Sequence, residues 1–385
     1  MLQKKAVVLR RMKKIAILVL NNFLHDSRVL RIARSLAQGG FAVTVVALHE
    51  GDLPEHEDME GFHLHRIRLR TRPLAKFRLV QYLKWAELFF RVSWQYRSFD
   101  FMHCCDVLPL PIAIWTKRLY NRRLKVVYDA HELEFDKNTR NRSWGSFLAS
   151  LEKRFIHQAD AQFTVSDLIA EAYVEEYGVP LPTVLYNCPN YEEVPAADHF
   201  RKQFNIPADR VLLIYQGALL PNRGVDLLIR YMEYRNDDRL ALIIMGYGQE
   251  KERLQAMAAG RTDVFFPPAV KPTELLPYTG SADIGAYFVQ NTNRSHDLTV
   301  GNKLFEYMMA GLPVISSPLK GPEAILTEET GVILADQSLE ALHAGVEHIL
   351  ERGLASYREA LSKAGRIYNW EEQEKHLLSV YRSLS

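Results

Sequence analysis

Short apolar segments alternate with amphipathic segments along most of this sequence. The segment 26–37 illustrates the amphipathic kind, because Val29, Ala33 and Leu36 recur at the spacing of one helix face. Apolar runs such as 15–20 predict buried strands, and their alternation with helices favours a parallel sheet covered by helices on both faces. In the first half the predicted strands are 15–20, 43–47, 101–103, 125–128 and 161–165, and the predicted helices are 26–37, 112–118, 147–158 and 167–177.

A Pro-rich passage without periodicity at 178–195 interrupts the pattern, which then repeats. We therefore expect an N-terminal domain at 12–187, a second domain at 198–365 and a C-terminal helix at 366–385. The predicted fold class is α/β, with two Rossmann-like parallel-sheet domains facing a central cleft at the carboxyl ends of their strands. In the second half the predicted strands are 211–216, 240–245, 264–266, 284–288, 314–315 and 331–334, and the predicted helices are 225–234, 249–258, 273–279, 303–309, 338–352, 354–364 and 370–384.

The segment 300–317 is the most informative part of the second half. It predicts a helix that ends at Gly311 and is followed by a strand, with Lys303 and Glu306 one turn apart near the helix start. A helix start beside a sheet is a natural site for an anion, and here it carries a cation and a carboxylate. An ordinary surface helix with a Lys–Glu pair is the alternative interpretation.

Glycines follow two predicted strands of the same half. The loop 217–224 contains Arg223, which can pair with a phosphate, and its backbone N–H groups can do the same. Gly246 and Gly248 end the next strand, where a plain tight turn is an equally simple explanation. In the first half, His131 follows a strand with an acid on each side, Asp129 and Glu132, which can tune its charge. No spacing of His and acid here matches a metal site, and no metal is expected.

Composition adds limits on the class of protein. The chain has 385 residues, 48% of them hydrophobic and 24% charged, which is typical of a globular protein. Three cysteines give no disulfide framework and suit a reducing cytoplasm. No apolar run approaches the roughly 20 residues of a membrane span. Residues 1–11 are expected to be a loosely held extension before an alternative start at Met12.

The formal net charge of +2 hides a basic stretch at Arg66–Arg97, where nine Lys or Arg accompany the single acid Glu87 among many aromatic residues. Such a stretch can contact an anionic membrane surface. A structural helix with snorkelling cations is the second interpretation. A nucleic-acid surface is the third, but no recognised binding module accompanies it, and no nucleic-acid partner is expected.

The motifs and their order resemble the retaining glycosyltransferases of the GT-B fold, GT4-like (glycosyl transferases group 1). The family's G-R-x-x-x-x-K-G loop is similar to 217–224, its G-x-G strand end to 246–248, and its E-A-M-A-x-G-x-P-V-I signature to 306–315. The resemblance spans nearly the whole chain, including the last helix, which in the family crosses back to the first domain.

The resemblance implies a glycosyltransferase (hexosyltransferase-type, retaining and metal-independent) that moves a sugar from a nucleotide-diphosphate sugar, with UDP the expected nucleotide. No cofactor is implied. Domain 12–187 would take the acceptor and domain 198–365 the donor. The implied acceptor is a glycan or a lipid-linked molecule in bacterial surface polysaccharide or cell-envelope glycan synthesis. The implied location is cytoplasmic and peripheral at the inner face of the cell membrane, through 66–97.

The resemblance also implies roles for individual residues. Glu306 would bind the ribose, Arg223 and Lys303 the diphosphate, and His131 would orient the sugar. The catalytic set is His131, Glu306, Arg223 and Lys303; the donor-binding set is Gly217, Ala218, Arg223, Gly246, Tyr247, Gly248, Gly301, Asn302, Lys303, Leu304 and Glu306; and the acceptor-side set is Asn22, Asp26 and Glu132.

The sequence departs from the family at two positions of the donor domain. Ala218 stands where the family has Arg, and Leu298 stands where it often has a second acid, one residue from Asp297. Lys303 would replace the missing cation. The departures keep one alternative open, namely a non-catalytic partner subunit of the same fold. A sugar-nucleotide epimerase is the second alternative, because it can share the two-domain architecture.

Overall fold

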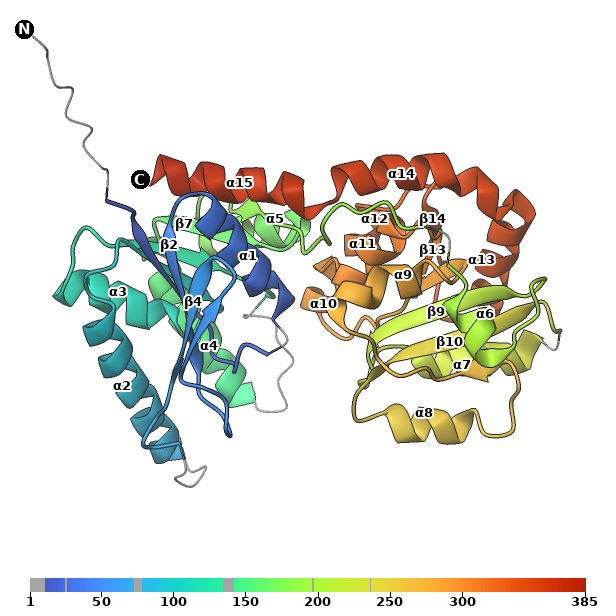
Figure 1. Ribbon diagram of the computed structural model, residues 1–385, viewed down its shortest axis with the longest axis horizontal. Helices are drawn as coiled ribbons and strands as arrows, with labels where there is room; N and C mark the ends of the chain where they lie inside the picture. Colours follow the sequence, from blue (N-terminus) through green and yellow to red (C-terminus); the bar gives the residue numbers. More distant parts are fainter. Residues whose placement is uncertain (1–10, 25, 73–77, 134–141, 196, 236) are drawn as a thin grey trace, which may run out of the picture. The chain divides into compact units, whose positions relative to one another are not determined.

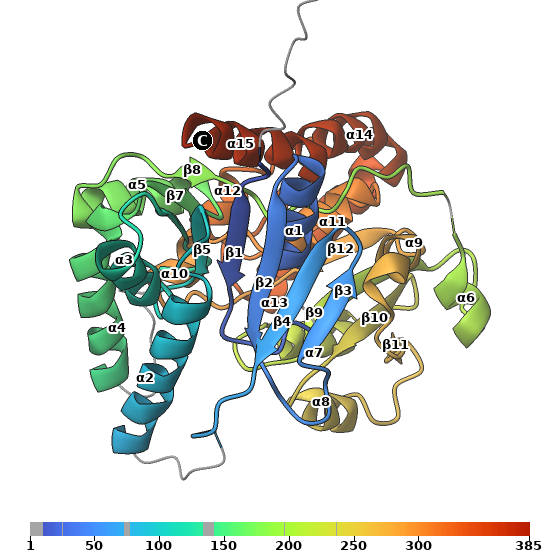
Figure 2. The ribbon, with the colours of Figure 1, turned by 60° about the vertical axis from the view of Figure 1, so that its left-hand side comes forward.

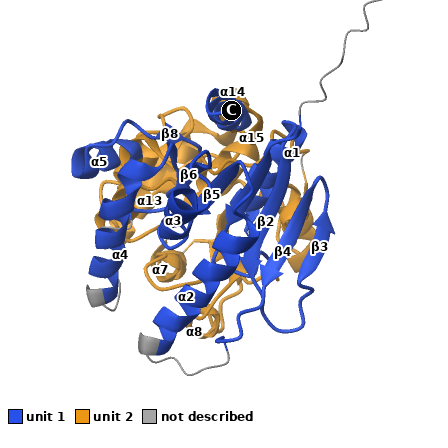
Figure 3. Ribbon diagram, turned by 90° about the vertical axis from the view of Figure 1, so that its left-hand side faces the viewer, with its two compact units in different colours: residues 1–164, 170–185, 374–385 blue, residues 165–169, 186–373 orange. Residues whose placement is uncertain are grey.

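The computed structural model describes residues 11–24, 26–72, 78–133, 142–195, 197–235 and 237–385. The expected extension at 1–11 therefore lies almost wholly outside the described residues. So does most of the segment 131–142, one of the two loops (with 21–27) through which the family resemblance implies that the acceptor enters. The chain divides into two compact units, shown in Figure 3. Unit 1 holds residues 1–164, 170–185 and 374–385, and unit 2 holds 165–169 and 186–373.

Unit 1 is built on an eight-stranded sheet in the order β3-β4-β2-β1-β5-β6-β7-β8. Its central strands are buried and hydrophobic, and β1 pairs in parallel with both β2 and β5 (Figure 2). The strands are β1 Lys14–Leu18, β2 Ala42–Leu48, β3 His56–Met59, β4 Phe62–Ile67, β5 Phe101–Cys105, β6 Lys125–Asp129, β7 Ala161–Thr164 and β8 Thr183–Val184.

The edge of this sheet differs from the prediction of parallel strands throughout. Strand β3 runs antiparallel to β4, so the two form a hairpin. The segment His56–Met59 is polar and short, which is why apolar periodicity did not reveal it. The first residues of the basic stretch, Arg66 and Ile67, belong to β4 and not to a helix. Strand β8 lies within the passage that was expected to be irregular.

Helices cover this sheet as the apolar spacing predicted. Helix α1 spans Ser27–Gln38, begins at the N-cap Asp26, and buries Val29, Ile32, Ala33 and Leu36. Helix α3 packs on β5 and β6 and lies between α2 and α4. The other helices of the unit are α2 Arg78–Gln95, α3 Leu110–Leu119, α4 Arg142–Phe155, the 3₁₀ turn η2 Ile156–Gln158 and most of α5 Asp167–Tyr177.

Helix α2 carries most of the remaining basic stretch. It buries Leu88 and Val92 and exposes several large apolar side chains, whereas Lys84 and Arg91 are half-buried. Within the described ranges, no helix is both long enough and apolar enough to cross a membrane. The exposed large side chains of α2 are Tyr82, Leu83, Phe90 and Trp94.

A buried carboxylate joins helices α4 and α5 to the sheet of unit 1. Glu152 is fully buried, and its oxygens accept hydrogen bonds from Tyr173 Oη at 2.6 Å, from Tyr177 Oη at 2.9 Å and from Tyr128 Oη. Burial and the nearby carboxylate raise the pKa of Tyr128 and Tyr173, so both hydroxyls remain donors. This cluster fixes α4 and α5 against β6.

Unit 2 is built on a six-stranded parallel sheet in the order β11-β10-β9-β12-β13-β14, of which β9, β10, β13 and β14 are labelled in Figure 1. The core strands β9 and β10 are almost continuously buried. The strands are β9 Val211–Ala218, β10 Leu240–Tyr247, β11 Val264–Phe265, β12 Ile284–Tyr287, β13 Val314–Ser316 and β14 Gly331–Ile333.

The helices of unit 2 follow the predicted pattern, with three short additions, α6, α10 and α12. Helix α15 begins in unit 2, and its residues from Glu374 onward belong to unit 1. All three cysteines are buried and form no disulfide. The helices are α6 His199–Phe204, α7 Val225–Arg235, α8 Lys251–Met257, η3 Pro272–Glu274, α9 Leu275–Thr279, α10 Arg294–Leu298, α11 Asn302–Met309, α12 Lys320–Glu323, α13 Leu339–Arg352, η4 Leu354–Tyr357, α14 Arg358–Ile367 and α15 Trp370–Ser383.

Candidate functional site

Three glycines bring the ends of β9 and β10 close together. Gly217 and Gly246 are register partners, and a Cβ on Gly246 would lie 1.9 Å from the carbonyl oxygen of Gly217. A Cβ on Gly248, whose φ is +151°, would lie 2.2 Å from the carbonyl oxygen of Leu219. The G-x-G pattern thus has a structural reason of its own, because no larger residue fits without moving the loop. Tyr247, between the two glycines, is 63% exposed.

Lys303, in the first turn of α11, lies beside this loop. Its Nζ is 4.1 Å from the ring centroid of Tyr215 and 5.9 Å from that of Tyr287. It would lie 3.7 Å from a Cβ on Gly217. Burial and the nearby Arg223 guanidinium lower the pKa of Lys303 to about 7, although Glu306 opposes the shift. Lys303 and the Arg223 guanidinium that lowers its pKa therefore lie near the carboxyl end of β9, where Glu306 acts on Lys303 in the opposite direction.

Glu306 is oriented by a residue that the sequence did not indicate. Gln216, buried at the end of β9, donates from Nε2 to Glu306 Oε2 at 2.7 Å. The other amide atom, Oε1, accepts from Thr279 Oγ1 at 2.6 Å, which fixes the direction of the amide. A polar side chain inside a buried strand was the available signal for Gln216.

The start of α11 is held by two further contacts. The Gly301 N–H donates to Tyr287 Oη at 2.9 Å, and Asn302 Oδ1 accepts from Asn187 Nδ2. Leu304 is fully buried and anchors the first turn in the core. Ala218 is the last residue of β9 and directly follows Gly217. The donor-side residues predicted from sequence thus lie around the carboxyl ends of the central strands of the unit 2 sheet.

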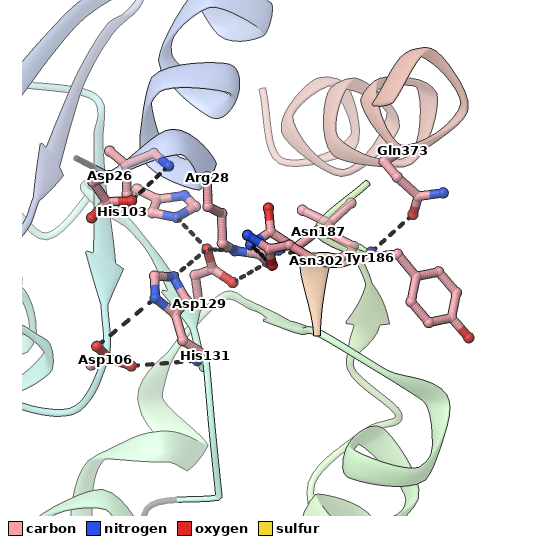
Figure 4. A network of polar contacts seen from close by, with 12 residues as sticks. Asp26, Arg28, His103, Asp106, Asp129, His131, Tyr186, Asn187, Asn302 and Gln373 are labelled. Atoms are coloured by element: carbon pink, nitrogen blue, oxygen red, sulfur yellow. Dashed lines mark hydrogen bonds and ion pairs between the residues drawn. The ribbon is translucent and has the colours of Figure 1, made fainter. Parts of the chain in front are cut away.

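In unit 1, His131 contacts a buried ion pair (Figure 4). Asp129, at the end of β6, is fully buried and forms two hydrogen bonds with Arg28, at 2.7 and 3.0 Å. His131 Nε2 lies 3.1 Å from Asp129 Oδ2, and Nδ1 lies 3.9 Å from Asp106 Oδ2. Burial alone would lower the pKa of His131, but the carboxylates of Asp129 and Asp106 outweigh it and raise that pKa.

The acids around His131 are not quite those expected from the sequence. Asp129 was expected, whereas the second carboxylate is Asp106 rather than Glu132, whose carbonyl oxygen accepts from Tyr173 Oη. Asp106 follows β5 with a left-handed φ of 65°, and a polar residue directly after a buried strand was the signal for it. For Arg28 the signal was a charged residue on the buried face of α1, beside the apolar Val29.

The other residues expected on the acceptor side take part in local structure. Asp26 caps α1 by accepting from the Val29 N–H at 3.1 Å, and it also accepts from Asn21 Nδ2 at 2.8 Å. Asn22 Nδ2 donates to Glu50 Oε2 at 2.8 Å. These contacts shape the loop after β1, and acceptor binding by its residues stays a prediction.

One cluster in unit 1 has the spacing of metal ligands. Ligand atoms of His103, Cys105 and Asp129 all lie within 4.8 Å of one another. However, Arg28 already neutralises Asp129, and burial together with Asp129 raises the pKa of the Cys105 thiol well above its usual range. A metal ion needs the thiolate, so this donor set suits an ion pair better than a metal.

Two glycosyltransferase family models match this chain. The "Glycosyltransferase Family 4" model matches residues 26–193, and the "Glycosyl transferases group 1" model matches residues 197–368. The two models together match well over half of the chain. The chain therefore belongs to the GT4-like glycosyltransferases of the GT-B fold, as the sequence resemblance predicted.

Among curated proteins, an uncharacterized glycosyltransferase of Methanocaldococcus jannaschii is 23% identical over 91% of this chain and 92% of its own length. The putative colanic acid biosynthesis glycosyl transferase WcaI of Escherichia coli is 24% identical over 52% of each chain. Apart from the first of these, the chain spans about half the length of the curated relatives it matches.

Solved structures show the same fold at low identity. A sucrose-phosphate synthase of Thermosynechococcus elongatus superposes with a TM-score of 0.79 at 19% identity, covering 97% of this chain and 99% of that chain. Anabaena HepE, solved in complex with UDP and glucose, superposes with a TM-score of 0.74 at 15% identity, covering 96% and 100%.

Proposed function

We propose that this glycosyltransferase transfers a sugar from a UDP-sugar to a glycan or lipid-linked acceptor with retention of configuration. The observation that carries the proposal is a pair of basic side chains, Lys303 and Arg223, near the end of β9. Gly217, Gly246 and Gly248 lie at the same place. A bound diphosphate would pair its negative charge with both of these side chains. The solved complex of HepE with UDP and glucose supports UDP as the nucleotide.

In this proposal each donor contact has a chemical task. Glu306, with its carboxylate directed by Gln216, accepts hydrogen bonds from the ribose hydroxyls, each worth about 1.5–3 kcal/mol. Lys303, Arg223 and the N–H groups at the start of α11 bind the diphosphate and stabilise it as a leaving group. This positive charge does the work that a metal ion does elsewhere, so the reaction is proposed to need no metal.

The departing phosphate is proposed to take the proton of the acceptor hydroxyl, because a retaining reaction of this kind uses no separate base. His131 is proposed to orient the sugar, and not to act as a nucleophile. Asp129 holds the His131 ring through Nε2 and raises its pKa, which leaves Nδ1 to contact a sugar hydroxyl.

The acceptor class and the location are supported by separate observations. WcaI is a putative colanic acid enzyme, which supports a role in surface polysaccharide or cell-envelope glycan synthesis. The exposed Phe90 and Trp94 of α2, beside Arg91 and Arg97, support peripheral contact with an anionic membrane at its inner face.

Release of nucleoside diphosphate from a panel of sugar nucleotides, with NMR of the product anomer and with and without a chelator, tests the proposal. UDP release that survives the chelator and gives a retained anomer is the expected result. No thermal shift with any nucleoside diphosphate would indicate a non-catalytic partner subunit. Conversion of the donor sugar without UDP release would indicate an epimerase.

Two variants and one binding assay separate the parts of the proposal. Glu306→Gln should weaken UDP binding, whereas His131→Ala should leave UDP binding unchanged and lower turnover. Cosedimentation with vesicles of anionic and of neutral lipid tests the membrane contact. Equal sedimentation with both vesicle types would refute it.

A further inference from the structure

Asp129 receives hydrogen bonds from three side chains of unit 1. These contacts determine which nitrogen of each histidine carries a proton. Its Oδ1 accepts from Arg28 Nη2 at 2.7 Å, and its Oδ2 lies 3.0 Å from Arg28 Nε, 3.1 Å from His131 Nε2 and 3.4 Å from His103 Nε2. Burial would raise the pKa of Asp129, but Arg28 and His131 hold it well below its usual range. An ionised carboxylate only accepts, so both imidazoles turn a protonated Nε2 toward it.

The position of the proton on His131 follows from this contact. With Nε2–H directed at Asp129, the ring nitrogen left for a ligand is Nδ1. Asp106 Oδ2 is 3.9 Å from Nδ1, which is too far for a hydrogen bond. The His131 side chain is 23% exposed, whereas Asp129 is fully buried.

Tyr381, near the end of α15, acts on the same carboxylate from a distance. Its hydroxyl lies 2.8 Å from His103 Nδ1, and both side chains are fully buried. Burial raises the pKa of Tyr381 well above its usual range, so the hydroxyl keeps its proton and can donate. Donation to Nδ1 holds His103 in the tautomer whose Nε2–H faces Asp129.

We propose that Asp129 and Tyr381 are positioning residues for His131. Asp129 holds the ring through Nε2 so that Nδ1 is presented to the sugar, and Tyr381 supports Asp129 through His103. The inference rests on the proposed role of His131 in contacting the sugar. Other titratable or charged groups that face this chain of contacts are Arg28 and Asp26 near the start of α1, and Cys105 and Asp106 at the end of β5.

NMR of the protein with ¹⁵N-labelled histidine reads the tautomers directly, with the His131 signals identified by their loss in His131→Ala. Nε2–H on both His131 and His103 is the expected result. In Tyr381→Phe, the His103 Nδ1 signal should shift because that nitrogen loses its hydrogen-bond donor, while Asp129 keeps the proton on Nε2. In Asp129→Asn, the His131 titration midpoint should fall, because the contacting carboxylate is gone. A neutral His131 protonated at Nδ1 would overturn the assignment.

Asp129→Asn leaves the buried Arg28 without its counter-charge and can fail to fold. Tyr381→Phe removes one hydroxyl and keeps the ring, so it carries the kinetic test. We expect kcat to fall severalfold, with an altered pH profile and an unchanged KM for the donor. Wild-type kcat and pH profile, together with an unchanged His103 Nδ1 signal, would overturn the role of Tyr381.

Tyr357→Phe is the matched control. Tyr357 is as buried as Tyr381, and its hydroxyl has no hydrogen-bond partner among the described residues. This variant should leave kcat and the histidine signals unchanged. The tautomers test the positioning of His131, and the turnover of His131→Ala tests its proposed function. The expected tautomers together with full turnover in His131→Ala would refute the function of His131 but not the positioning by Asp129.

Discussion

The pKa of Lys303 makes donor binding depend on pH in a calculable way. In the free protein the lysine titrates at about 7, because it is buried near Arg223. A bound diphosphate favours the charged ammonium and raises this pKa toward its ordinary value of about 10.4. Between these two values the complex holds more protons than the free protein, so binding takes up a proton. Affinity must therefore fall as the pH rises above 7.

The size of the effect follows from the fraction of free protein that carries the proton. That fraction is about one half at pH 7 and about one part in a hundred at pH 9, so UDP should bind about 50-fold more weakly at pH 9. Phosphate itself contributes little, since its second pKa is about 6.

Isothermal titration of UDP at constant ionic strength measures the effect. Titrations in buffers of different ionisation enthalpy also count the protons taken up. In Lys303→Arg the guanidinium stays charged, so affinity should hardly change from pH 7 to 9. Lys303→Met should bind weakly and without this pH dependence. A flat wild-type profile, or a wild-type slope in Lys303→Met, would refute the reasoning.

Three further predictions concern binding and stability. Glu306→Gln keeps the shape of the side chain but removes its charge, so UDP affinity should fall roughly 10- to 100-fold in the same titration. Gly246→Ala places a methyl group against the Gly217 carbonyl, and it should lower the unfolding free energy by about 1–3 kcal/mol and impair UDP binding; a wild-type Tm would contradict this. Tyr177→Phe removes one hydrogen bond to the buried Glu152 carboxylate and should cost about 1.5–3 kcal/mol in denaturant unfolding, without loss of UDP binding.

Much of the local structure is legible in the sequence because helices and buried strands have distinct periods. Helix α11 shows this well: its apolar spacing, its end near Gly311 and the strand after it were all predicted. The positions of Lys303 and Glu306 in its first two turns follow from that spacing alone. The family motifs then indicated which edge of the second sheet matters.

The polar and antiparallel parts of the fold were not predictable in this way. Strand β3, with the sequence HEDM, is short and polar, so no apolar period marked it. Strand β4, with the sequence FHLHRI, does alternate apolar residues with imidazoles, but its last residues were assigned to the basic stretch that begins at Arg66. Parallel pairing with β2 and antiparallel pairing with β3 complete β4 as a strand.

The sequence by itself determined the two αβ repeats and the family, and it predicted part of each candidate site but not Gln216, Asp106 or Arg28. Only the tertiary structure decided how those residues are held. Arg28 and Asp129 are 101 positions apart, and His103 and Tyr381 are 278 apart, yet each pair is in hydrogen-bond contact. The physical reason is that periodicity reports which face of an element is buried, whereas contacts between elements depend on strand order and helix packing. The low pKa of Lys303 likewise comes from burial near Arg223, which no spacing along the chain expresses.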